Sequence, residues 1–138
     1  MPYVHIRHSL TDAIIHSIEV DQPRQLFPAD LKNLDLSNLD LRGADLPGAD
    51  FTGATLIGAS LKEADLARAR GLSDLRYCDL DACNLSGCDL RGVEIYPANY
   101  SKRTKLFDAK ISAGSDLDAA RKEIAEANRW KDFRRANP

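Results

Sequence analysis

The sequence predicts a mainly β protein: a right-handed, parallel, quadrilateral β-helix of about four coils, with a β-hairpin before it and an α-helix after it. Three observations lead to this fold class. Large apolar residues recur every five positions through the middle of the chain, a small residue stands two positions before most of them, and both ends lack this period. A repeat of this kind indicates stacked coils, and the open ends of such a stack need caps of a different sequence.

The five-residue period begins at Leu31 and holds without a slip to Leu66. A helix needs spacings of three and four and a strand alternates every two residues, so neither places residues five apart on one face. A chain that turns a corner every five residues does, and four corners make a coil that stacks on the next by parallel β-type hydrogen bonds. The inward large positions are Leu31, Leu36, Leu41, Leu46, Phe51, Leu56, Leu61 and Leu66, and the small positions are Ala29, Leu34, Leu39, Ala44, Ala49, Ala54, Ala59 and Ala64.

The register breaks at residues 69–73 and resumes at Leu75. Because this segment cannot keep the period, we expect it to form a corner loop near 69–73. Its residues Arg70, Gly71 and Leu72 are therefore candidate contacts for a partner.

The repeat units resemble those of a known family. The units Ala44-Asp45-Leu46-Pro47-Gly48 and Ala49-Asp50-Phe51-Thr52-Gly53 are similar to the A-(D/N)-(L/F)-x-x signature of pentapeptide-repeat proteins. The resemblance extends over residues 29–113. It implies the quadrilateral right-handed β-helix described above. It also implies a function without catalysis, because some members of the family imitate DNA and inhibit or protect DNA gyrase.

The two ends divide the chain into a hairpin cap with its linker (1–28), the β-helix (29–113) and a helix (114–138). Strand-like residues on both sides of the turn at 10–13 predict the hairpin, and a leading hairpin loosely resembles small phage and bacterial members of the family. At the other end, Ser115 is a candidate N-cap and Asp118 completes a pattern similar to a capping box. The helix has two interpretations, a cap on the last coil or a homodimer contact. The candidate contact residues for either are Leu117, Ile124, Trp130 and Phe133.

No residue pattern indicates catalysis, a metal site or a cofactor. Cys78, Cys83 and Cys88 stand five apart at the small inward position, where buried packing is the expected role. Zinc sites instead use ligand pairs that converge on one point. The histidines are all in the hairpin segment, without an acidic or thiol partner beside them. We therefore expect a protein that is not an enzyme.

The acidic residues beside the inward leucines form the main candidate surface. One interpretation is structural, because Asp at a corner bonds to local backbone. The other is functional, because carboxylates stacked on a rod imitate the field of DNA phosphates. Residues 29–100 carry 7 basic and 12 acidic residues, which is a modest field. The candidate acidic surface consists of Asp30, Asp35, Asp40, Asp45, Asp50, Asp65, Asp79 and Asp89.

The sequence thus predicts a binding protein with a protein partner, either DNA gyrase or another DNA-binding protein. The alternative is an interaction scaffold for a partner that is not a topoisomerase, with a phage- or host-regulatory role. Direct binding of nucleic acid by the basic tail is not expected, because the tail has no recognised motif or aromatic platform. No apolar run reaches the length of a membrane span. Three cysteines and no secretion signal predict a cytoplasmic location.

Overall fold

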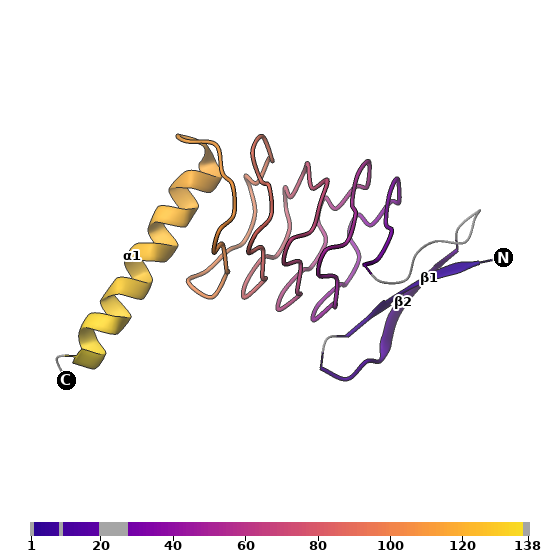
Figure 1. Cartoon of the computed structure of the whole chain (residues 1–138), viewed down its shortest axis with the longest axis horizontal. Coiled ribbons are helices and arrows are strands. Elements are labelled where there is room, and N and C mark those ends of the chain that lie inside the picture. The colour runs from indigo at the N-terminus through magenta and orange to yellow at the C-terminus, as the bar shows by residue number, and fades with distance from the viewer. Residues whose placement is uncertain (1, 9, 20–27, 137–138) are drawn as a thin grey trace.

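The computed structural model describes residues 2–8, 10–19 and 28–136, and the side chains of this set except those of 130–133. Its elements are a hairpin of β1 (Tyr3–Arg7) and β2 (Ile14–Glu19), a long coiled middle, and α1 (Asp116–Ala136). The hairpin and α1 lie at opposite ends of the coiled middle (Figure 1). Residues 20–27, which include the linker expected after the hairpin, lie outside the described residues. Within the described part of the chain, no helix is long and apolar enough to cross a membrane.

The coiled middle is held by parallel bridges between residues about one turn apart. The step is twenty residues in the first turns, as from Asp30 to Asp50. It is nineteen from Ser60 to Asp79 and twenty-one from Asn84 to Lys105. One turn therefore contains one residue fewer than the first turns, and a later turn contains one more.

The shorter turn is where the sequence predicts a corner loop. Arg70 still pairs with Asp50 and Asp74 pairs with Glu94, so these two wall positions are four residues apart instead of five. Leu72 is buried. The interruption at 69–73 is therefore a shortened side of the coil and does not project as a loop.

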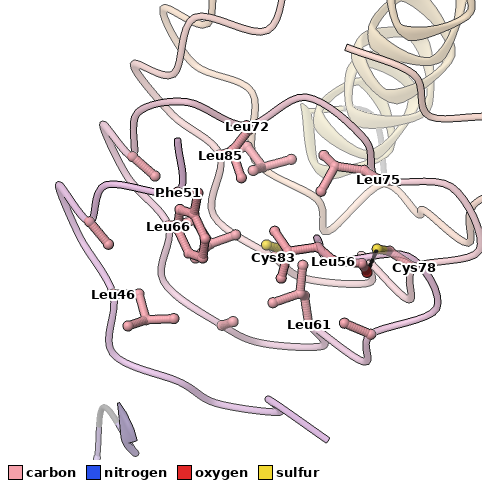
Figure 2. Close-up of a cluster of buried hydrophobic side chains, with 14 of the residues drawn as sticks. Leu46, Phe51, Leu56, Leu61, Leu66, Leu72, Leu75, Cys78, Cys83 and Leu85 are labelled. Atoms are coloured by element: carbon pink, nitrogen blue, oxygen red, sulfur yellow. Dashed lines mark hydrogen bonds between the residues drawn. The ribbon is translucent and has the colours of Figure 1, made fainter. Parts of the chain in front are cut away.

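The interior is a single column of large apolar side chains. Leu31, Leu41, Phe51 and Leu61 are completely buried, and Figure 2 shows such residues from successive turns packed inside the coil. The small positions fit where the backbone closes on the column. Ala44, Ala49, Ala59, Ala64, Cys78, Cys83 and Cys88 are all at most 1% exposed.

Corners are formed by residues with a left-handed backbone, which favours glycine. These φ values lie near +60° to +75° and recur every five residues, first at Asn33 and Asn38 and then at Gly43 and Gly48. At Gly71 (φ +74°) a Cβ atom would stand 2.5 Å from the backbone nitrogen of Thr52. No side chain fits there, because the neighbouring turn is too close.

Candidate functional site

The outward aspartates are held in fixed positions by the backbone. In seven of the eight candidates, a side-chain oxygen accepts a hydrogen bond from the N–H two residues later, at 3.0–3.3 Å. This bond lowers the pKa of Asp35, for which the Ser37 N–H is the largest cause. Asp45 is exposed. The seven bonded residues are Asp30, Asp35, Asp40, Asp50, Asp65, Asp79 and Asp89.

Two of these carboxylates are also neutralised by an arginine of the same turn. The Arg91 guanidinium holds Asp89 with a 2.7 Å contact and lowers the pKa of that carboxyl to about 2. The same arrangement pairs Arg42 with Asp40 and lowers its pKa. A third pair joins Arg76 to Asp74, outside the predicted set. Each pair comes from an Asp-Leu-Arg triplet, a local sequence signal that a count of acidic positions does not reveal.

Other carboxylates accept hydrogen bonds from side chains of adjacent turns. Thr55 donates its hydroxyl to Asp35 at 2.9 Å, and the amide of Asn99 donates to Asp79 at 2.9 Å. The rows are also interrupted along the stack, since Asp45 and Asp65 are followed by Asn84 and Lys105. Much of the predicted acidic surface thus takes part in the hydrogen bonds that hold the coil together.

The three candidate contact residues of the register break differ in their exposure to solvent. Arg70 is exposed and lies 3.6 Å from a carboxylate oxygen of Asp50. Leu72 is only 7% exposed, so it belongs to the core. Of the three candidate contacts, Arg70 and the backbone of Gly71 remain accessible to a partner.

The cysteines are buried thiols. Cys78 donates its S–H to the Leu56 carbonyl at 3.0 Å, and Cys88 donates to the Leu66 carbonyl at 3.1 Å. Burial raises the pKa of both to about 11 and also raises that of Cys83. A thiol held in this form is a poor nucleophile and a poor metal ligand. Among the described residues, no three His, Cys, Asp or Glu side chains could hold a metal ion together.

The start of α1 is capped as the sequence predicts. The Asp118 backbone N–H donates to the Ser115 hydroxyl at 3.1 Å, and the Asp118 carboxylate accepts the Gly114 N–H at 3.0 Å. The Gly114 bond is the largest cause that lowers the pKa of Asp118 to about 2, followed by Lys122. Arg121 and Lys122 are ion-paired with this carboxylate.

The first half of α1 closes the coil. Leu117 is 1% exposed and joins the core cluster, and Ile124 is 8% exposed. The Tyr100 hydroxyl donates to Glu123 at 3.0 Å, which ties the helix to the last turn. Of the four candidate contact residues, Leu117 and Ile124 are therefore used in packing within the chain. The side chains of Trp130 and Phe133 lie outside the described set.

A groove lies between α1 and the segment 102–107 of the last turn, with a volume of about 800 Å³. Its walls include Leu106, Phe107, Ile124 and Ala125, and Lys102 and Lys105 line it as well. Phe107 is 77% exposed. No local sequence pattern predicts this groove, because only the crossing of α1 over the last turn creates it.

The repeats of the coil match a known family model. Residues 29–70 and 72–96 match the model described as pentapeptide repeats, in eight copies. No curated protein sequence matches the chain significantly.

Solved structures that the chain matches include pentapeptide repeat proteins and a fluoroquinolone resistance protein. The protein alr5209 from Nostoc PCC 7120 is 27% identical over 62% of this chain and 82% of its own, with a TM-score of 0.35. HetL from the same Nostoc strain, involved in regulation of heterocyst differentiation, is 30% identical over 62% of this chain and 42% of its own, with a TM-score of 0.31. QnrB1, a plasmid-mediated fluoroquinolone resistance protein, is 21% identical over 69% of this chain and 41% of its own, with a TM-score of 0.29.

Proposed function

Because this chain belongs to the pentapeptide-repeat family, whose repeats form a right-handed β-helix, we propose that it is a binding protein without catalytic activity and that its target is another protein. The observation that carries the proposal is a set of large side chains at the corners of the coil. Tyr77, Tyr96 and Phe107 are 66%, 75% and 77% exposed. Aromatic residues are enriched in protein interfaces and supply much of their binding energy.

The side of the coil that carries Tyr77 and Tyr96 favours binding by a preformed surface. Tyr77 donates its backbone N–H to the carbonyl of Pro97 on the next turn, so Tyr77 and the segment that holds Tyr96 are tied together. A surface held by the backbone loses little conformational freedom when a partner binds. The three free thiols favour a reducing, cytoplasmic setting for this activity.

A pull-down from a cell lysate, with this protein immobilised as the bait, tests this function. We expect a protein that is retained by the wild type and lost when Tyr77 and Tyr96 are both replaced by Ala. Tyr3→Ala is the matched control, because Tyr3 is an exposed tyrosine on the hairpin. Retention that disappears on nuclease treatment would point to nucleic acid and contradict the proposal, as would identical retention by all three baits.

DNA-mimicking action on DNA gyrase, as an inhibitor or protector, is the more specific candidate. The observation in its favour is that outward carboxylates stack on adjacent turns, with Asp45 bridged to Asp65 and Asp30 to Asp50. We place it second because the Asp-Leu-Arg pairs and the bridge from Asp50 to Arg70 reduce the acidic field.

A supercoiling assay separates the two candidates. If gyrase is the partner, the wild type changes supercoiling or quinolone-induced cleavage, and the double change Asp45→Asn with Asp65→Asn weakens that effect. Asp108→Asn is the control, because it removes one exposed carboxylate elsewhere on the coil. Unchanged gyrase activity at excess protein, with and without quinolone, rules this candidate out and leaves the partner to be another protein.

A further inference from the structure

The segment 104–108 of the last turn is an open backbone edge of the coil. In each earlier turn, the residues at the same three positions exchange backbone hydrogen bonds with the following turn. For example, Leu85 donates its N–H to the Lys105 carbonyl at 2.8 Å, and Gly87 donates to the Phe107 carbonyl at 2.8 Å. In the last turn these positions are the Thr104 carbonyl and the N–H groups of Leu106 and Asp108. None of the three is hydrogen-bonded to any residue that the structure describes.

The same side of the coil shows at its other end how such an edge is closed. There Asp45 donates its N–H to the Arg7 carbonyl at 2.7 Å, and His8 forms an antiparallel bridge with Ala44. An extended segment from outside the coil therefore pairs with this side at the N-terminal end. At the C-terminal end the corresponding place is the groove beside α1.

The groove can bind an apolar side chain of an occupant in addition to the backbone that pairs with the open edge. Phe107 is largely exposed, and Leu106, Ile124 and Ala125 complete an apolar lining. An edge with unpaired N–H and C=O groups is a template for one more strand. A helix cannot use these groups, because its own backbone donors and acceptors are bonded internally.

The charges around the groove fix the chemistry of the occupant. Arg103 is paired with Asp81, and Arg121 is paired with Asp118. Lys102 and Lys105 are exposed and form no ion pair with any side chain that the structure describes. The uncompensated charge at the groove is thus positive, and it complements a negatively charged segment.

We propose that this groove binds an extended, acidic segment of a partner protein, which adds as a strand to Thr104–Asp108. Its backbone pairs with the open edge, an apolar side chain packs on Phe107, and its carboxylates face Lys102 and Lys105. This is strand addition, a recurrent mode of peptide recognition. The proposal rests on the function as a protein-binding protein, and it names the surface and the chemistry of the partner.

A displayed library of short random peptides, selected on the full-length protein, tests the proposal directly. We expect enriched peptides in which acidic residues flank alternating apolar positions. Phe107→Ala should weaken binding of a synthetic enriched peptide about thirtyfold, as truncation of a central aromatic does. Lys105→Glu should weaken it about fivefold or more, the scale of an exposed ion pair.

Matched controls separate this groove from a general charge effect. Lys110→Glu makes the same charge change at the equivalent position of the next side of the coil, outside the groove, and should leave binding unchanged. A peptide methylated at the one backbone nitrogen that would donate to the Thr104 carbonyl should lose binding, since strand addition requires that donor. Circular dichroism of each variant verifies that it is folded.

The alternatives give different results. Equal weakening by Lys105→Glu and Lys110→Glu, or full binding of the methylated peptide, would overturn the proposal. So would a dimer in light scattering that Phe107→Ala converts to a monomer, because the occupant would then be a second copy. If no peptide is enriched over the Phe107→Ala protein while the Tyr77 and Tyr96 surface still retains a partner, the groove proposal fails and the proposed function stands.

Discussion

The two ends of this coil face the same physical problem and close it in different ways. At the N-terminal end, β1 continues the hydrogen-bonded wall through Asp45 and Arg7, and it buries Val4 and Ile6 against the first turn. At the C-terminal end, α1 covers the last turn with side chains such as Leu117, and in the described part of the chain no hydrogen bond between two backbone groups joins it to residues 94–110. The link to the backbone there is made by the Asn128 side chain, which donates to the Lys102 carbonyl at 3.4 Å.

The difference follows from the backbone of each cap. A strand has free N–H and C=O groups on its outer side, so it can satisfy the edge that it covers. A helix uses its backbone groups internally and can cover an edge only through its side chains. The side of the coil at Ala44 and Asp45 is therefore closed by backbone pairing, whereas the same side at the C-terminal end is shielded over its core and open at its rim. Substitutions at either end can break this contrast.

The largest effect is expected from a charge placed under the hairpin. Ile6 is completely buried between the hairpin and the first turn, so Ile6→Asp should cost several kcal/mol and detach the hairpin. The wall at Ala44 and Asp45 would then be an exposed edge, which invites aggregation. Light scattering measures the aggregation, with Ile14→Asp as the control because Ile14 is 48% exposed. An Ile6→Asp protein that stays monomeric in light scattering would contradict the closure of this edge by the hairpin.

A cavity under the helix should have a smaller effect and a different character. Leu117→Ala removes a buried side chain and should lower the free energy of unfolding by about 2–5 kcal/mol. Because α1 closes no backbone edge, we expect loosening of the helix without the aggregation that follows loss of the hairpin. Chemical denaturation gives the stability, light scattering gives the aggregation, and the exposed Glu126→Ala is the control. Aggregation as strong as that of Ile6→Asp would remove the contrast between the ends.

The coil itself could be predicted from the sequence because its rule is local. Every fifth residue is large, and the most deeply buried small positions hold Ala or Cys. The caps were also predictable as elements, since strand composition in residues 3–19 and the Ser115–Asp118 pattern are local signals.

The candidate site was harder to predict, for two physical reasons. The candidate acidic surface was predicted from the positions of the aspartates, without the partners of their charges. In the structure, Asp40 and Asp89 are neutralised by arginines two residues away. The groove depends on the angle at which α1 leaves the last turn, and no local pattern encodes that angle. The open edge at Leu106 follows from the same crossing.

A moderate effect is expected at the helix cap. Ser115→Ala removes the hydroxyl that accepts the Asp118 N–H at 3.1 Å, which should cost about 1 kcal/mol. Ser115→Asp should restore most of this loss, because a carboxylate also caps a helix. Thermal denaturation compares the three proteins. If Ser115→Asp is as unstable as Ser115→Ala, the cap is not what stabilises the C-terminal end.

The last prediction concerns pH and the Asp118 carboxyl at the C-terminal end. The pKa of Asp118 is lowered to about 2 in the folded protein, chiefly by the Gly114 N–H and then by Lys122, whereas an unfolded aspartate titrates near about 3.9. A lowered pKa means that the charged form favours folding. The contribution is therefore complete above the unfolded value and disappears as the pH falls through the folded value.

Comparison of wild type with Asp118→Asn isolates this group from the other carboxylates. The stability difference measured by chemical denaturation should be constant above about pH 4 and should shrink between about pH 4 and pH 2. A difference that grows as the solution becomes more acidic would have the wrong sign for a carboxylate held in its charged form. It would mean that the helix cap does not depend on the ionised Asp118, and the C-terminal closure would then rest on the packing of Leu117 and Ile124 alone.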